Sequence, residues 1–381
     1  MESINIKIGG DFVINKEAFS SKNIDKKLIT LFQNSDLNIL NLECPITNAG
    51  KEHQILKTGP YLKGIESEIC KTVELLNINL LTLANNHILD YGEKGLKDTL
   101  RILKQHRFEY VGAGENLNKA KEVFRKNIKG KVISFINFAE NEWCSATLNS
   151  GGANPMNIID NVHQIQEEKK VADIVIVIIH GGHEYYNLPS PRMIEQYRFY
   201  AENGADVIIG HHTHCISGYE YYNGVPICYS LGNFLFTENS NYPDWFTGLV
   251  AEIEIETTGK ISLNLHPIEY DNQNFSLKLL QGDSKKTVLN RAKGFAEIIK
   301  NPDSIKQEWE SFIQKQTKNY LEMLSPVTQI KFRYLKGILY KLKLSKKLIS
   351  KKGFALSLNL NRCEAHSDIV KEVMTTFINK K

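Results

Sequence analysis

The chain has 381 residues, long enough for one large domain with an appendage or for two domains. Hydrophobic residues make up 42% of the sequence and charged residues 24%, which excludes a largely disordered chain, while a net charge of +4 favours no class of partner. The sequence has no apolar run long enough to span a membrane, no recognisable signal peptide and no CxxC pair among its six cysteines. We therefore expect a cytoplasmic protein with free thiols.

Short apolar, β-branched runs alternate along the chain with segments of helical periodicity. Strands are predicted at 4–8, 37–42, 80–83, 132–137, 174–179, 207–209, 227–230 and 249–254. Helices are predicted at 66–77, 93–106 and 191–203. This alternation is typical of an α/β fold, in which helices cover a sheet.

The character of the sequence changes after about residue 270. We predict a first domain over 1–270 and a mainly helical extension over 271–381. Within the extension, 331–352 holds nine Lys or Arg and no acidic residue, and apolar residues alternate with the basic ones at roughly helical spacing. This pattern favours a basic amphipathic helix, which either lies on an anionic membrane surface or docks its apolar face on the main domain.

Several predicted strands end in side chains that can bind a metal or a phosphate. These side chains are Asp11, Glu43, Asn85, Asn86, His87, His180, His183, Glu184, His211, His212, His214 and Asn233. In α/β sheets, ligands collect outside the carboxyl ends of the strands, where loops converge and helix N-termini point inward. We therefore expect these residues to share one site.

The residue types indicate which ion such a site would hold. Carboxylates, imidazoles and an amide oxygen form a mixed N/O donor set, which suits Mn, Fe or Zn better than Ca²⁺. Taken singly, each feature has a structural alternative. His180 could be a hydrogen-bonded core histidine, Glu43 could cap a turn, and Asn85–Asn86 could supply left-handed loop geometry. The cluster HHTH (211–214) is the feature that most favours function.

Together these motifs resemble a known family. GGD (9–11), NLECPIT (41–47), LANNHILDYG (83–92), GAG (112–114), HGGHEY (180–185), GADVIIGHHTH (204–214) and YSLGNFLF (229–236) are similar, in order and spacing, to the motif set of the CapA (PGA_cap) capsule-synthesis family. The resemblance covers roughly 4–250. It implies a four-layer α/β/β/α sandwich of the calcineurin-like metallophosphoesterase type.

The resemblance also implies roles for the site residues. The phosphoesterase pattern places Asp11 and His214 on a first metal, Glu43 between two metals, and Asn86, His180 and His212 on the second. It implies that His87 is the catalytic acid and that Asp90 orients an imidazole. Around them, the residues expected to bind substrate are Asn85, His183, Glu184, His211 and Asn233.

The sequence departs from the standard phosphoesterase pattern at three positions. Val13 stands where the first motif has a histidine, Glu43 where the bridging residue is an aspartate, and Ile88 where an acidic residue follows the catalytic histidine. The first metal would therefore have fewer protein ligands. We expect one or two divalent ions (Mn, Fe or Zn), with the first site either weakly occupied or absent.

Two functions follow as hypotheses. The first is a metal-dependent hydrolase of phosphoester or amide bonds, acting on an envelope polymer or a phosphorylated precursor in capsule or extracellular polymer biosynthesis. The second is a non-catalytic accessory or polymer-binding subunit of a membrane-associated synthesis or export complex, in which 331–352 contacts anionic lipid at the membrane periphery. Nucleic acid is not an expected partner, because the main domain lacks any recognised nucleic-acid-binding module.

Overall fold

The structure is a computed structural model, and it describes residues 3–324, 326–330, 332–344, 348, 350–362, 366, 369–370, 374 and 378. The chain forms two compact units, Met1–Lys306 and Gln307–Lys381. The first unit contains every residue predicted to form the site. It extends past the predicted boundary at residue 270, because a further strand and a long helix pack onto it.

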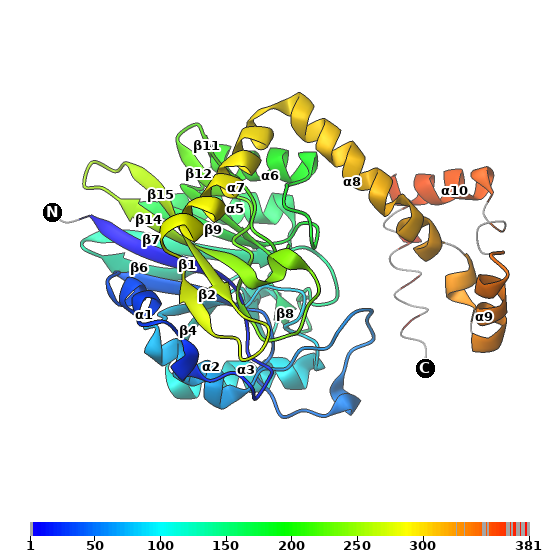
Figure 1. Ribbon diagram of the computed structural model, residues 1–381, viewed down its shortest axis with the longest axis horizontal. Coiled ribbons are helices and arrows are strands. Elements are labelled where there is room, and N and C mark those ends of the chain that lie inside the picture. The colour runs from blue at the N-terminus through cyan, green and yellow to red at the C-terminus, as the bar shows by residue number, and fades with distance from the viewer. Residues whose placement is uncertain are drawn as a thin grey trace. The chain divides into compact units, whose positions relative to one another are not determined.

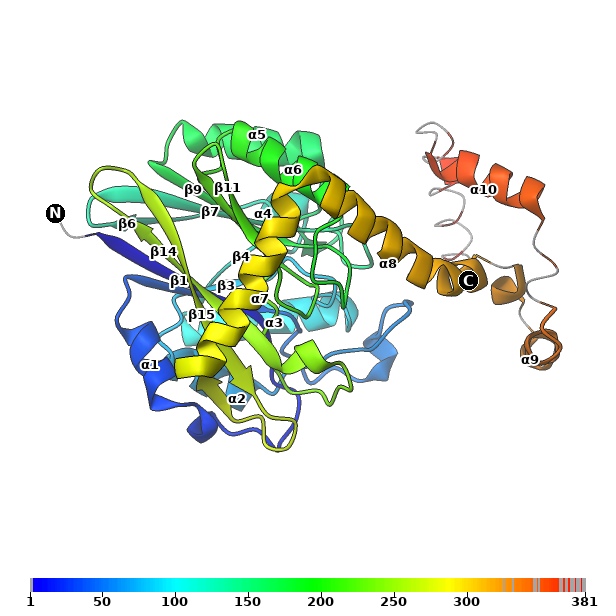
Figure 2. The same ribbon diagram turned by 45° about the horizontal axis from the view of Figure 1, so that its top comes forward.

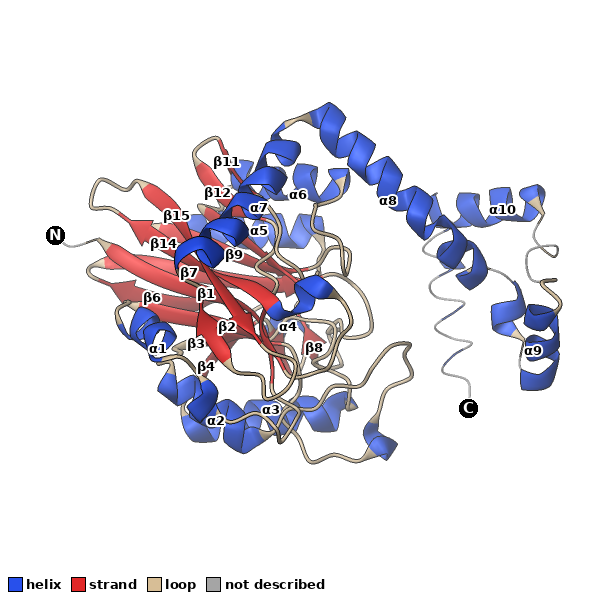
Figure 3. Cartoon of the chain, in the orientation of Figure 1, coloured by secondary structure: helices blue, strands red, loops and turns tan. Residues whose placement is uncertain are grey.

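The first unit is built on two sheets (Figures 1 and 3). In the first sheet the strand order is β16 (Leu277–Leu279), β15 (Ile261–Tyr270), β14 (Thr247–Ile255), β1 (Ile4–Val13), β2 (Leu37–Leu42), β3 (Leu80–Thr82) and β4 (Glu109–Val111). Strands β1 to β4 are parallel, and β13 (Asn233–Phe236) pairs in parallel with the last residues of β1.

The second sheet has the order β11 (Tyr219–Tyr222), β12 (Val225–Cys228), β10 (Val207–His211), β9 (Ile174–His180), β7 (Lys131–Ala139) and β6 (Phe124–Ile128). Its central strands β7, β9, β10 and β12 are parallel. A small ribbon joins β5 (Ala113–Gly114) to β8 (Gly152–Ala153). Since the parallel strands are covered on both faces, they consist of nearly continuous apolar runs, such as IVIVIIH in β9.

Three hydrophobic cores separate four layers. Between the sheets pack Ile6, Ile8, Ile39, Ile176, Ile178 and their neighbours. Outside the first sheet, a second core is covered by α1 (Lys26–Gln33), α2 (Glu66–Leu75) and α3 (Gly92–His106). Outside the second sheet, a third core is covered by α5 (Ile158–Lys169) and α6 (Pro191–Glu202). The predicted α/β/β/α sandwich is confirmed.

Helix α7 (Gly282–Lys300) contacts strands of both sheets, β11 and β15, and lies across β15 in Figure 2. Small residues on its inner face allow a close approach: a Cβ at Gly218 would lie 2.5 Å from the backbone nitrogen of Ala296. Short elements complete this unit: α4 (Leu117–Ala120) and three 3-10 helices at Ser21–Asn23, Lys51–His53 and Pro243–Phe246.

The extension is helical, as predicted, but its basic segment is not one helix. Helix α8 (Pro302–Met323) is followed by a 3-10 turn (Pro326–Gln329), α9 (Arg333–Lys341) and α10 (Lys351–Arg362). Helix α9 ends because Lys343 adopts a left-handed conformation (φ 55°), and the N–H groups of Lys343 and Leu344 bond back to the carbonyls of Tyr340 and Leu339. Residues 331, 345–347 and 349 of the predicted segment lie outside the described residues.

Candidate metal centre

Asp11 reaches the site because β1 is distorted where it ends. The pairing of β1 with β2 shifts register between Ile8 and Asp11, and the Asp11 N–H donates to the Gly232 carbonyl at 3.0 Å. A Cβ on Gly10 would lie 1.8 Å from that same carbonyl oxygen, so only glycine allows β1 and the segment before β13 to come this close. The GGD motif (9–11) and the LGN motif (231–233) therefore pack directly against each other.

The ends of β2 and β3 supply the next donors. Glu43 follows β2 directly, and Asn86 lies in the loop after β3. Asn41 lies on β2, two residues before Glu43. Its side-chain amide nitrogen donates to Asp11 Oδ1 at 2.7 Å, and the same nitrogen lies 3.1 Å from His180 Nδ1. This amide therefore holds a carboxylate of the first sheet against an imidazole of the second.

The second sheet supplies the histidines. His180 is the last residue of β9, and His212 and His214 follow β10. Both His212 (φ 93°) and His214 (φ 55°) have positive φ, which is uncommon for residues other than glycine and costs of the order of 1–3 kcal/mol each. The His212 N–H donates to Asp11 Oδ2 at 3.1 Å, so the strained turn is tied to β1.

The predicted ligands converge. Two groups of donor atoms each lie within 4.8 Å of one another: Glu43 with His180 and His212, and Asp11 with Glu43 and His214. His180 Nε2 lies 3.3 Å from Glu43 Oε1, 3.1 Å from His212 Nδ1 and 3.1 Å from Asn86 Oδ1. Glu43 belongs to both groups, in the position predicted for a bridging carboxylate.

The environment of Glu43 shows whether the cluster is suited to bind a cation. Both of its carboxylate oxygens are buried, and neither has a hydrogen-bond partner among the described residues. Burial, followed by repulsion from Asp11, raises the pKa of Glu43 well above its ordinary value. A buried carboxylate without a partner costs several kcal/mol, and a divalent cation between Glu43 and its neighbours would remove that cost. The donor set fits the metal.

Asp11, His180 and His214 are in the protonation states that ligation requires. Burial opposes ionisation of Asp11, but the nearby imidazoles of His211, His180 and His214 outweigh it, so the pKa of Asp11 lies well below its ordinary value. Burial lowers the pKa of His180 and of His214, which keeps both rings neutral near pH 7. Asn233 accepts at Oδ1 from His214 Nδ1 at 3.0 Å, which leaves His214 Nε2 toward Glu43.

His87 and Asp90 lie beside the cluster. His87 Nδ1 is 2.7 Å from Asp90 Oδ2, so the ring is oriented as predicted and its Nε2 remains for the cleft. Asp90 also accepts from the Leu62 N–H and forms an ion pair with Lys57, whose side chain is only 2% exposed. Lys57 belongs to the loop between the 3-10 helix Lys51–His53 and α2, and it holds that loop against the His87–Asp90 pair.

The cluster opens into a cleft of about 430 Å³. Asn86, His87 and His214 line this cleft together with carboxylates and aromatic rings. The other lining residues include Lys57, Glu142, Trp143, Glu184, Tyr185, Phe236, Glu238 and Trp245. The half-exposed Tyr185 ring stacks on buried Trp245, with centroids 6.3 Å apart and planes inclined by 27°. The cleft therefore offers a rigid aromatic surface beside the metal-competent cluster.

The residues predicted to bind substrate divide into two sets. Glu184 lines the cleft, and His183 lies next to it at partial burial. Asn85, His211 and Asn233 are buried: Asn85 donates to the Leu42 carbonyl, His211 Nδ1 lies 3.4 Å from Asp11, and Asn233 holds His214. In this conformation the buried set cannot touch a substrate and instead supports the ligands.

Sequence reasoning missed Asn41, Lys57 and Glu142. Asn41 could have been predicted from the sequence, because it lies two residues before Glu43 along an extended segment, so both side chains point to the same face. No sequence pattern pointed to Lys57 or Glu142. Both lie in loops whose path depends on the packing of the whole first unit.

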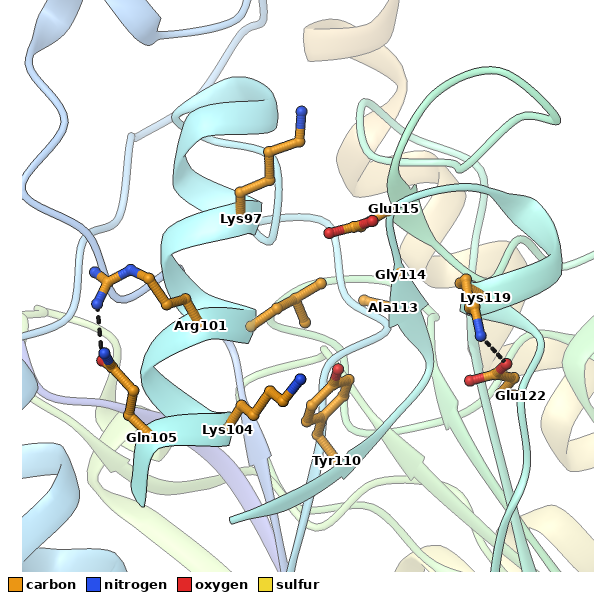
Figure 4. Close-up of a pocket in the computed structure, with 11 residues that line it drawn as sticks. Lys97, Arg101, Lys104, Gln105, Tyr110, Ala113, Gly114, Glu115, Lys119 and Glu122 are labelled. Carbon is orange, nitrogen blue, oxygen red and sulfur yellow. Dashed lines mark hydrogen bonds and ion pairs between the residues drawn. The ribbon is translucent and has the colours of Figure 1, made fainter. Parts of the chain in front are cut away.

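A larger concavity, of about 670 Å³, lies away from the cluster, between α3 and the segment β4–β5–α4 (Figure 4). Its polar side chains largely satisfy one another. Arg101 donates to Gln105 at 2.8 Å, and Lys119 pairs with Glu122 at 2.7 Å. None of the predicted site residues lines it, and we assign it no role.

The fold and the site together define an α/β/β/α sandwich with a group of metal-competent side chains at its strand ends. Comparison with known families narrows this class. The family described as bacterial capsule synthesis protein PGA_cap matches residues 6–238, and the chain belongs to that family.

Two curated relatives and one solved structure are similar to the chain. The capsule biosynthesis protein CapA of Bacillus anthracis is 30% identical over 249 residues, which are 62% of this chain and 61% of the relative. The PGA biosynthesis protein CapA of Bacillus subtilis is 36% identical over 211 residues, 55% of each chain. The matches thus span less than two thirds of either relative. A phosphatase structure from Mycoplasma pneumoniae has a TM-score of 0.46 and 15% identity, covering 72% of this chain and 96% of that one.

Proposed function

We propose that the protein is a metal-dependent hydrolase of phosphoester bonds, or of amide bonds, in capsule or extracellular polymer biosynthesis. One observation carries the proposal: a buried carboxylate without a hydrogen-bond partner, Glu43, is shared by two groups of potential metal ligands. Family membership supports the biological setting, because the relatives are named for capsule and PGA biosynthesis. The substrate is then an envelope polymer or a phosphorylated precursor of one.

The residues would divide the work as follows. Asp11, Glu43 and His214 hold one cation, Glu43, Asn86, His180 and His212 hold a second, and the ion is Mn, Fe or Zn. A bound cation supplies Lewis acidity toward the scissile group and lowers the pKa of a coordinated water. His87 donates a proton to the leaving oxygen from Nε2, and Asp90 fixes the ring through Nδ1.

The test is hydrolysis of bis-p-nitrophenyl phosphate and p-nitrophenyl phosphate by the full chain, with metal content measured on the same sample. We expect bound transition metal, hydrolysis that EDTA removes and Mn²⁺ restores, and a loss of both metal and activity in Glu43→Gln. The matched control is Glu122→Gln, which removes a surface carboxylate paired with Lys119 outside the cleft. Absence of metal together with absence of hydrolysis would contradict the proposal.

A second candidate is an accessory subunit that binds polymer or precursor without cleaving it, on the cytoplasmic face of a membrane-associated complex. The exposed apolar and basic side chains of α9 favour it. The same experiment separates the two candidates. Stoichiometric metal without turnover of either ester or of an amide substrate would favour the accessory role.

A further inference from the structure

Glu142 lies in the loop that follows β7, and this loop is anchored on both sides of it. On one side, Glu140 accepts from the Gly182 N–H at 3.0 Å and pairs with Arg192 at 2.5 Å. On the other side, Cys144 is fully buried and its carbonyl accepts from the Ala153 N–H at 2.7 Å. The position of Glu142 is therefore set by the fold on either side.

The Glu142 carboxylate faces two of the proposed ligands. Its Oε1 lies 3.6 Å from His212 Nε2, and its Oε2 lies 3.5 Å from Asn86 Nδ2. His212 and Asn86 both approach His180 from different strands, so Glu142 closes the side of this group that opens to the cleft. Its side chain is 37% exposed, whereas those of Glu43, His180 and His212 are at most 5% exposed.

Simple electrostatics does not explain why a carboxylate is held here. Glu142 is close to the buried Glu43 and contributes to raising the pKa of that residue, so without a cation the two carboxylates destabilise one another. A cation held by Glu43, His180 and His212 reverses the sign of this interaction. A carboxylate beside the second nitrogen of a ligating histidine also fixes the orientation of the ring and raises its basicity as a ligand.

We propose that Glu142 is a positioning residue for the cation held by Glu43, Asn86, His180 and His212. It lies against His212 Nε2 and Asn86 Nδ2, while His212 Nδ1 and Asn86 Oδ1 face His180 Nε2 within the donor group. This inference rests on the metal site of the proposed function and adds to it a carboxylate, on the cleft side, that orients two of the ligands.

The test measures the affinity of the full, metal-free chain for Mn²⁺. Isothermal titration calorimetry gives the affinity, and loss of the free-Mn²⁺ EPR signal measures it independently. We expect Glu142→Gln to weaken binding about 10- to 100-fold, as loss of a residue that orients a metal ligand does in other metal proteins. Glu238→Gln is the matched control: it removes the same charge from the same cleft, at 35% exposure, and leaves the ligand group untouched. We expect its affinity to stay within about twofold of wild type.

Each outcome has one meaning. Equal Mn²⁺ affinity in wild type and Glu142→Gln would overturn the assignment, and so would equal weakening by both variants, which would indicate a general effect of charge. Glu142→Asp keeps the charge but shortens the reach, so full affinity in that variant would also overturn it. Circular dichroism of the metal-free variants checks folding. If the wild type binds no Mn²⁺, the proposed function fails first, independently of Glu142.

Discussion

At the scale of single residues, the His87–Asp90 pair lies apart from the two groups of potential metal ligands. Both side chains are buried and lie 2.7 Å apart, and neither belongs to a group of donor atoms that could hold the metal. Lys57 completes the arrangement by neutralising Asp90. A histidine held this way presents a defined tautomer, and the carboxylate is what defines it.

We therefore expect Asp90→Asn to retain metal and to lower kcat for phosphate-ester hydrolysis about 10²- to 10⁴-fold, because the amide no longer enforces the productive tautomer. Steady-state kinetics on metal-quantified protein measures this. Asp160→Asn, which removes a surface carboxylate paired with Lys121, should leave kcat unchanged. An Asp90→Asn enzyme with wild-type kcat would remove His87 and Asp90 from the mechanism.

Residue by residue, the sequence predicts the metal-competent cluster well because each of its members follows a recognisable strand. Glu43, His180 and His212 could be located in this way, since parallel strands end at a common edge. Orientation could not be predicted: His211 and His212 are adjacent, yet only His212 belongs to a group that could hold the metal. His212 has a positive φ, and the residue type alone does not predict this backbone conformation.

At the scale of elements, most of the buried strands were predicted, although the short buried strand β13 was not, and the edge strands were missed. The run LNILNL predicts β2 with its observed bounds, because every residue in it is buried. The edge strand β6 reads FRKNI, and the edge strand β11 reads YEYY; neither shows a clear apolar run, because one face or one edge meets solvent. The extent of β1 beyond residue 8 was also missed, since Gly9 and Gly10 interrupt its pattern.

The hypothesis that the extension contacts a membrane can be tested at helix α9. It has no buried residue and no acidic residue, and its apolar side chains Tyr334, Leu335 and Ile338 are 89%, 46% and 53% exposed. We expect the full chain to co-sediment with phosphatidylserine-containing vesicles, because basic residues near an anionic surface contribute about 1 kcal/mol each. Reversing Arg333, Lys341 and Lys343 to Glu should lower vesicle binding at least about tenfold.

The matched control reverses three exposed lysines of α7: Lys286, Lys293 and Lys300. This variant changes net charge equally but spares α9, so its vesicle binding should be close to that of wild type. Equal binding by all three proteins, or equal loss in both variants, would contradict a role for α9 at the membrane. None of the described helices is long and apolar enough to cross a membrane.

At the scale of the whole molecule, the site exists because two sheets bring their parallel strand ends to one edge. Asp11 and Glu43 come from the first sheet and His180 and His212 from the second, joined through the amide of Asn41. Alternating strands and helices predict the fold class, but they do not predict how the strands divide between sheets. The resemblance to a family supplied the two-sheet, four-layer arrangement, which the observed layers confirm, but it did not assign each strand to a sheet.

The measurement that tests the central claim most directly is an anomalous difference map at the manganese edge, from crystals of the full chain grown with MnCl₂. We expect one or two peaks within about 2.0–2.3 Å of a Glu43 oxygen, the stronger one also bonded to His180 and His212. A map without a peak at Glu43, or with manganese bound only elsewhere, would contradict the claim that this buried carboxylate exists to hold a metal.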